Sequence, residues 1–173
     1  GTWSVPSGAF VQKVAFRPGS ESQVLLVCTT HKQILGYDRR AGSGSTPAFT
    51  LDNDTMVNTM CCYRDGVHVL SGDKHGNLKT WDLRQLNAVA CLANGELGKP
   101  ISHVELSSPV DAVERDAVDD GRFLAVNSYD NLLRVYERER TTLQLRHMVK
   151  GHHNKNWPIR SAFYMGKNYH RSR

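Results

Sequence analysis

Histidines in the second half of the chain are the first candidates for chemistry, because neutral imidazole is a common metal ligand. They are His103, His147 and the adjacent pair His152 and His153. Their spacing matches no zinc-ligand pattern, and no second cluster of carboxylates or thiols lies near them in the sequence. We therefore expect structural or solvated histidines, and the sequence predicts no metal site.

A run of acidic residues could suggest a calcium loop. Its members are Asp111, Glu114, Asp116, Asp119 and Asp120. Calcium loops carry ligands at every second position, and this alternation is absent from the run. The acidic run is therefore interpreted as a solvated turn.

The sequence contains no pattern that would build an active site. There is no Gly-x-Ser-x-Gly nucleophile elbow and no Gly-rich phosphate-binding loop. The sequence thus predicts a protein that is not an enzyme and that has neither catalytic residues nor a cofactor. Binding is the remaining kind of function.

Size and charge set broad limits on this function. The 173 residues suffice for one domain, and 39% of them are hydrophobic. No apolar run approaches the roughly 18 residues that span a membrane, and the start does not resemble a signal peptide. The net charge of +5 favours acidic partners weakly, but the basic residues are scattered, so nucleic acid is not the preferred partner.

Four cysteines, Cys28, Cys61, Cys62 and Cys91, bear on the compartment. Adjacent residues of a strand point to opposite faces, so Cys61 and Cys62 suit neither a mutual disulfide nor a metal site. We expect buried or half-buried free thiols, which are typical of a reducing compartment. The chain is therefore predicted to be intracellular, in the cytoplasm or the nucleus.

The stretch from Leu70 to Arg84 carries the strongest structural pattern. Two short apolar runs flank a polar turn that contains Gly76 and Asn77, a pair typical of β-hairpins. The second run ends in Trp81-Asp82. This stretch therefore predicts a hairpin, and the rest of the chain shows whether the unit recurs.

The same order of strands does recur along the sequence. Predicted first strands begin at Val11, Val57, Val110 and Ile159, at intervals of 46, 53 and 49 residues. Units of this length that cannot bury their own faces must stack on neighbours. We predict one domain of repeated units, which span residues 11–51, 56–106, 109–149 and, for the start of a fourth, 151–173.

The second unit leaves two strand assignments open. Its residues 83–100 form a longer connection than in the other units, and this part tolerates a short helix, so an insertion is expected here. Residues 101–106 are favoured as the outer strand of this unit, and residues 88–92 are the alternative.

The repeated unit resembles the WD repeat, in which about 40–45 residues form one four-stranded propeller blade. The most specific matches are Trp81-Asp82, Gly151-His152 and the turn Ser128 to Asn131. The resemblance implies an all-β fold, a fragment of a WD-repeat β-propeller made of four-stranded antiparallel blades. Propellers close with roughly four to eight blades. We therefore expect an open ring in this chain, which remaining blades or a second chain would complete.

WD repeats also contain a buried hydrogen-bond network. It joins a His before the first strand, an Asp in the hairpin turn, a Ser or Thr of the second strand and the Trp of the third. Each unit here keeps only part of it, and His75 replaces the turn Asp of the second unit. By resemblance, structural roles fall to Ser71, Trp81, Asp82, Asp130, Gly151 and His152.

The resemblance places the hairpin turns and the loops before the first strands on one face. Candidate partner-binding residues on that face are Lys74, His75, Tyr129, His153, Asn154, Lys155, Asn156 and Trp157. For Trp157, an interface anchor and a residue packed between blades are equally good interpretations. The basic neighbours suit an acidic peptide or a phosphate group.

Arg84 is a further candidate, at the opposite face. Trp81-Asp82-Leu83-Arg84 resembles the Trp-Asp-x-Arg pattern of substrate receptors of cullin-based ubiquitin ligases, whose Arg contacts the ligase adaptor. The favoured hypothesis is a non-catalytic scaffold that presents propeller loops to a protein or peptide partner. The alternatives are such a substrate receptor, through Arg84, or a WD-repeat protein associated with nucleic acid.

Overall fold

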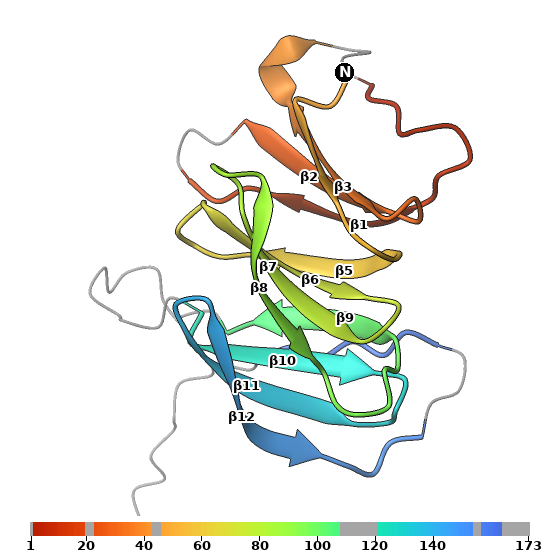
Figure 1. Ribbon diagram of the computed structural model, residues 1–173, viewed down its shortest axis with the longest axis vertical. Helices are drawn as coiled ribbons and strands as arrows, with labels where there is room; N and C mark the ends of the chain where they lie inside the picture. Colours follow the sequence, from red (N-terminus) through yellow and green to blue (C-terminus); the bar gives the residue numbers. More distant parts are fainter. Residues whose placement is uncertain (1, 20–22, 43–45, 108–120, 154–156, 164–173) are drawn as a thin grey trace, which may run out of the picture.

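The computed structural model describes residues 2–19, 23–42, 46–107, 121–153 and 157–163 (Figure 1). Twelve strands and one short 3-10 turn, Arg39–Ala41, make up the regular structure of these residues. The strands form three antiparallel sheets of four strands each. The prediction of an all-β fold built of four-stranded antiparallel sheets is confirmed.

Within each sheet the strands are paired in sequence order. The first sheet contains β1 (Val11–Phe16), β2 (Val24–Thr29), β3 (Gln33–Asp38) and β4 (Phe49–Asp52). The second contains β5 (Val57–Cys62), β6 (His68–Asp73), β7 (Asn77–Asp82) and β8 (Asn87–Ala93). The third contains β9 (Ile101–Leu106), β10 (Phe123–Ser128), β11 (Leu133–Glu139) and β12 (Thr142–Val149).

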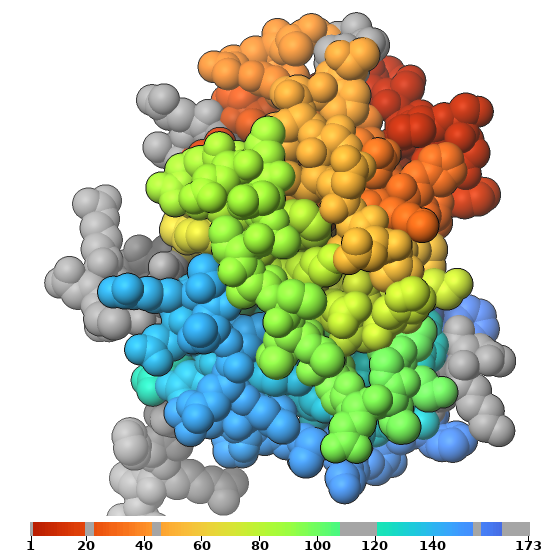
Figure 2. Space-filling model, in the orientation of Figure 1, coloured from red at the N-terminus to blue at the C-terminus, as the bar shows by residue number. Residues whose placement is uncertain are grey.

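The three sheets follow one another as layers, like consecutive blades of a propeller (Figures 1 and 2). Their first strands are neighbours, because β5 contacts both β1 and β9. Asn58 on β5 donates a hydrogen bond of 2.9 Å to the carbonyl oxygen of Ile101 on β9. The fold is therefore propeller-like, with the first strands on its inner side.

Apolar side chains fill both spaces between the sheets. Between the first and second sheets pack Leu26, Ile34, Leu51, Val57, Met60, Val69 and Trp81. Between the second and third sheets pack Tyr63, Leu70, Leu78, Ile101, Val104, Leu124, Val126 and Tyr136. The middle strands are apolar on both faces because each face is buried against a neighbour.

The cysteines of β5 serve two different cores. Cys62 packs against the core between the first and second sheets, and Cys61 packs against the core between the second and third. The prediction that these two thiols point to opposite faces is confirmed. All four cysteines are free, and burial raises the pKa of both Cys28 and Cys62 to about 12.

The outer face of the first sheet is covered in part by the N-terminal segment. Trp3 and Val5 pack against Val27, Leu35 and Tyr37. The hydroxyl of Tyr37 donates a hydrogen bond of 2.8 Å to the carbonyl oxygen of Ser4. Residues before β1 thus occupy the place that a neighbouring sheet occupies elsewhere in the molecule.

The favoured assignment in the second unit was wrong. Residues 101–106 form β9 and belong to the third sheet, whereas Asn87–Ala93 forms the outer strand β8 of the second. Residues 83–86 make the turn between β7 and β8, so no helix is inserted there. The reason is pairing, because β8 completes the ladder of β7 with partners from Asn77↔Ala93 to Asp82↔Asn87.

The third sheet consequently starts earlier than predicted. The first strands begin at Val11, Val57 and Ile101, at more even intervals of 46 and 44 residues. Val110, which was predicted to begin a first strand, lies outside the described residues, as does the acidic run. The extra length lies between β9 and β10, which residues 107–122 connect, compared with 17–23 and 63–67 in the other sheets.

A candidate partner-binding site at the turn end of the sheets

One repeated contact brings the hairpin turns and the incoming loops together. In each sheet the residue after the second strand donates its N–H to a carbonyl just before the first strand. These bonds join Thr30 to Phe10 (3.0 Å), Lys74 to Met56 (2.9 Å) and Tyr129 to Pro100 (3.0 Å). We call this end of the molecule the turn end. Lys74, His75 and Tyr129 all lie there, as the sequence predicted.

The β6–β7 turn is fixed by Asp73. Its carboxylate oxygen Oδ1 accepts hydrogen bonds of 2.9 Å from the backbone N–H groups of His75 and Asn77. Gly76 adopts a φ of 80°, a conformation that glycine tolerates best. Asp73 therefore fixes the backbone of this turn. The neighbouring residues Lys74 and His75 are both exposed.

The β10–β11 turn is fixed by a buried ion pair. Asp130 accepts from the backbone N–H of Leu132 at 3.1 Å, and its Oδ2 lies 2.6 Å from Nη2 of Arg134. Burial alone would raise the pKa of Asp130, but hydrogen bonds from Arg134 and Ser128 outweigh it and hold that pKa below its usual value. Tyr129 is thus held next to a rigid, ionised pair.

Lys74 and Tyr129 share a cavity of about 350 Å³, which we call the central pocket. The pocket lies among the first strands of the three sheets, with Lys13 from β1, Asn58 from β5 and His103 from β9 in its wall. His75 is not part of the wall. The structure therefore joins Lys74 and Tyr129 in one site and leaves His75 beside it.

The chain after β12 returns to the same place. The hydroxyl of Ser102 donates to the carbonyl oxygen of Ile159 at 3.2 Å, as Asn58 does to Ile101 one sheet earlier. Asn127 Nδ2 donates to Ser161 Oγ at 2.7 Å. Residues 157–163 are not a strand, yet they lie beside β9 in the way that β9 lies beside β5.

This returning segment adds Pro158 and Arg160 to the pocket wall. The side chain of Trp157 is 77% exposed. Asn154, Lys155 and Asn156 lie outside the described residues, while His153 is exposed and His152 and Gly151 precede them in the chain. Of the predicted candidates in this loop, His153 and Trp157 are therefore placed on the surface, and neither lines the pocket.

Three basic residues of the pocket wall are among those that the sequence analysis missed as partner-binding candidates. They are Lys13, His103 and Arg160, which come from different strands and segments and share no motif. Burial, together with the nearby charges of Lys13 and Arg160, lowers the pKa of His103 to about 4. The one pattern that could have indicated His103 is the alternation of faces along a strand, which places His103 on the same face as Ile101 and Glu105.

Aromatic residues of the third strands β7 and β11 donate buried side-chain hydrogen bonds. Trp81, buried in the first core, donates from Nε1 to the hydroxyl of Ser71 at 2.8 Å. Tyr136 donates instead to Oδ1 of Asn94, which precedes the third sheet, at 2.8 Å. The prediction missed Asn94 because this bond crosses between two neighbouring sheets and joins residues 42 positions apart in the sequence.

A second buried polar contact crosses between the first two sheets. Asn53, directly after β4, donates from Nδ2 to Oδ2 of Asp73 at 3.3 Å. Asn53 belongs to the stretch that stands where the WD-repeat resemblance would place Gly-His. The second unit thus combines the Trp81–Ser71 bond with a contact between Asn53 and Asp73.

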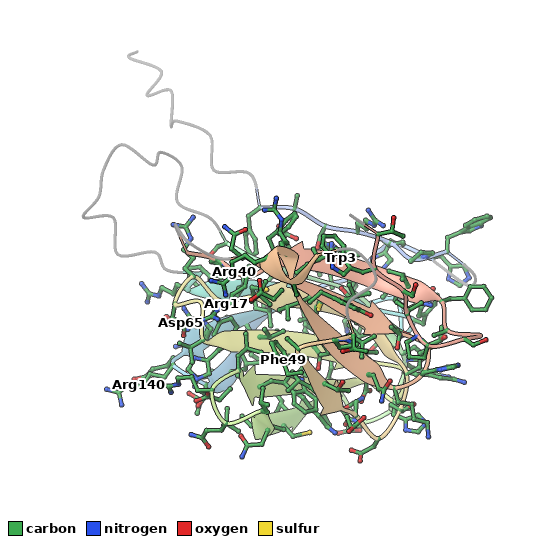
Figure 3. All side chains as sticks on the ribbon, turned by 90° about the horizontal axis from the view of Figure 1, so that it is seen from above. Trp3, Arg17, Arg40, Phe49, Asp65 and Arg140 are labelled. Carbon is green, nitrogen blue, oxygen red and sulfur yellow. The ribbon has the colours of Figure 1, made fainter. Side chains whose placement is uncertain are left out.

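The opposite end of the sheets carries arginine–aspartate pairs, one of them formed by Arg40, which Figure 3 labels. Arg84 donates from Nε and Nη2 to the two carboxylate oxygens of Asp82, at 3.2 and 2.8 Å. Arg40 binds Asp38 in the same way, at 3.0 and 2.7 Å. Hydrogen bonds from Arg84 hold the pKa of Asp82 well below its usual range, and those from Arg40 lower the pKa of Asp38 to about 2.

The described residues also bear on metal binding and on membrane spanning. Within the described residues, no three His, Cys, Asp or Glu side chains gather as metal ligands would. The described part also contains no helix that is long and apolar enough to cross a lipid bilayer. A search with models of known protein families finds none that matches the chain.

Proposed function

We propose that this chain is a non-catalytic interaction scaffold, a partial WD-repeat propeller that presents its turn end to a protein or peptide partner. The observation that carries the proposal is the central pocket. Lys74 and Tyr129, from the turns of two different sheets, line it together with residues of three first strands. A cavity whose wall is built by several repeats is typical of a binding site, because it forms only when those repeats are stacked on one another.

The WD-repeat part of the proposal rests on three features. The sheets are four-stranded, antiparallel and paired in chain order. Their first strands adjoin. Trp81 and Ser71 make the bond that the repeat would require. Asp73, Asn53 and the Asp130–Arg134 pair depart from the usual network, so the proposed repeats are degenerate.

A peptide-selection experiment tests the scaffold proposal. A displayed library of random peptides would be selected on the purified chain. The double variant Lys74→Ala/Tyr129→Ala should bind the enriched peptides about tenfold or more weakly, because aromatic anchors dominate interface energies. Arg64→Ala is the control, since Arg64 is exposed and follows β5 at the opposite end of the second sheet.

The proposal predicts loss of binding in the double variant alone. Selection that enriches no peptide, or peptides that bind both variants like the unaltered chain, would contradict it. The folded state of each variant would be checked by its thermal unfolding midpoint.

A second candidate function is the substrate receptor of a cullin-based ubiquitin ligase. The observation in its favour is the exposure of Arg84, whose side chain is 66% accessible although it binds Asp82. Its planar guanidinium could still reach an acidic partner surface. Arg84→Ala should abolish co-purification with the ligase adaptor, whereas Arg40→Ala, which alters the matching pair in the first sheet, should not. Adaptor binding that survives Arg84→Ala removes this candidate.

A further inference from the structure

The central pocket has an unusual charge for its position. Its wall contains three cationic side chains, Lys13, Lys74 and Arg160, which come from β1, the β6–β7 turn and the segment after β12. No Asp or Glu among the described residues lines it. Three cations that converge on one cavity from separate parts of the chain create a field that attracts anions.

These three cations differ from six other basic residues of the described structure, which are paired with carboxylates. Arg40, Lys79, Arg84, Arg122, Arg134 and Arg146 each lie within salt-bridge distance of a carboxylate. Within the same described ranges, no carboxylate forms such a pair with Lys13, Lys74 or Arg160. The pocket therefore gathers three cations that no carboxylate of the described structure pairs with at salt-bridge distance.

His103 lies in the same wall and is affected by two of these cations. Burial and the charges of Lys13 and Arg160 keep its imidazole neutral, because they lower its pKa to about 4. Glu105, on the same strand, lies 3.7 Å from its Nε2 but does not line the pocket. The charges that shift the pKa of His103 are therefore those of Lys13 and Arg160.

Neutral polar and apolar residues complete the wall. The hydroxyl of Ser102 and the amide of Asn58 are already used to hold Ile159 and Ile101 in place. They therefore fix the backbone of the pocket, while the cations and the phenol of Tyr129 are left to face a ligand. A phenol beside ammonium and guanidinium groups can donate a hydrogen bond to an anionic oxygen.

We propose that the central pocket binds an anionic side chain of a partner peptide, a carboxylate or a phosphate, between Lys13, Lys74 and Arg160. The proposal rests on the scaffold function and names the chemistry of its ligand. A guanidinium and two ammonium groups bind both kinds of oxyanion through charge-assisted hydrogen bonds. The shared chemistry is the oxyanion, and the source is decided by experiment.

The test measures binding of four labelled probes by fluorescence polarisation at low salt. The probes are a hexaglutamate peptide, a peptide with one phosphoserine in a neutral sequence, a hexaglutamine peptide and a single-stranded oligothymidine. Either the hexaglutamate or the phosphoserine peptide should bind, and hexaglutamine should not. The tighter of the two anionic peptides identifies the source of the anion.

Variants then locate the binding site. Arg160→Gln and Lys13→Gln should each weaken binding of the anionic peptide by about tenfold or more, the usual effect of losing a charge-assisted hydrogen bond. Arg64→Gln removes the same charge at the opposite end of the second sheet and should leave the affinity unchanged. An equal loss in all three variants would reduce the effect to net charge and overturn the proposal.

A second readout does not depend on these variants. An anion held between Lys13 and Arg160 cancels their repulsion of the imidazolium, so the pKa of His103, followed by NMR, should rise when the anionic peptide binds. An unchanged His103 pKa at saturation would place the ligand elsewhere and overturn the proposal. Tighter binding of oligothymidine than of both anionic peptides would also overturn it, in favour of nucleic acid.

Failure of this inference can be told apart from failure of the scaffold function. Library peptides that need Lys74 and Tyr129 but lack acidic residues, and that bind Arg160→Gln normally, would leave the scaffold proposal intact and exclude the anion site. If neither library peptides nor anionic probes bind, both proposals fall.

Discussion

Asp130 and Arg134 form an ion pair that is almost entirely withdrawn from water, since both side chains are 7% exposed. Each charge is tolerated because of the other, and because Ser128 and the backbone of Leu132 supply further hydrogen bonds to the carboxylate. A buried pair of this kind adds little net stability, yet removal of one partner is costly. The turn that carries Tyr129 therefore depends on both members.

Asp130→Ala should lower the free energy of unfolding by about 3–5 kcal/mol, because it leaves the Arg134 guanidinium buried without its partner. Urea unfolding followed by circular dichroism would measure it. The double variant Asp130→Leu/Arg134→Leu should lose less than Asp130→Ala. Arg40→Ala, in a pair whose arginine is 75% exposed, should change stability little. A double variant no more stable than Asp130→Ala would contradict the pairing argument.

Single residues also show how far the sequence could predict the site. Lys74 and Tyr129 were found because they sit in hairpin turns that the pattern of strands defines. Lys13, His103 and Arg160 were not, because their partnership exists only once the first strands adjoin. A contact made across sheets leaves no trace in local spacing, as Asn53 with Asp73 and Asn94 with Tyr136 also illustrate.

At the level of elements, most strands follow from the alternation of apolar and polar residues and from turn residues. β8 is the exception. Its sequence, Asn-Ala-Val-Ala-Cys-Leu-Ala, is rich in residues that tolerate a helix, and most of its side chains are exposed. An outer strand of this kind needs no apolar face. The segment becomes a strand because it pairs with β7 and follows a turn in which Leu86 adopts a φ of 56°.

The contact between β6 and β9 offers a prediction at the same scale. A Cβ atom at Gly72 would lie 2.6 Å from Cγ2 of Ile101, so glycine allows these sheets to approach. Gly72→Ala should destabilise the fold by about 1–3 kcal/mol, as overpacking of a core does. The measurement is again the free energy of unfolding in urea.

The control for Gly72→Ala is a double-mutant cycle. Ile101→Ala alone should cost about 2–5 kcal/mol, because it opens a cavity. Gly72→Ala combined with Ile101→Ala should cost clearly less than the sum of both, since the clash disappears with the Ile101 side chain. Strict additivity would show that the two positions do not meet as described.

For the whole molecule, the two end sheets matter most, because each has one face without a neighbouring sheet in the described structure. Exposed apolar residues gather on the first sheet and its approach, namely Phe10, Val11, Val14 and Phe16, at 73%, 49%, 45% and 61% exposure. The last strand exposes Leu145, Met148 and Val149, at 43%, 52% and 49%. Patches of this kind mark surfaces that other proteins cover.

We therefore expect the isolated chain to self-associate as its concentration rises, with the apolar surface near β1 as one contact. Sedimentation velocity should show a concentration-dependent mean mass. Val14→Ser/Phe16→Ser should shift it towards the monomer without lowering the unfolding midpoint. Leu97→Ser, at a side chain 73% exposed elsewhere, is the control. A strictly monomeric, well-folded chain would exclude the two-chain ring expected from the sequence.

The neighbouring thiols of β5 have a practical consequence. Cys61 and Cys62 are consecutive and half-buried, yet Cys61 packs against the core between the second and third sheets and Cys62 against the core between the first and second. The rates at which a small alkylating reagent modifies them, resolved by mass spectrometry, would report separately on transient opening at each seam. Two consecutive cysteines would thus serve as separate probes of local opening between different pairs of sheets.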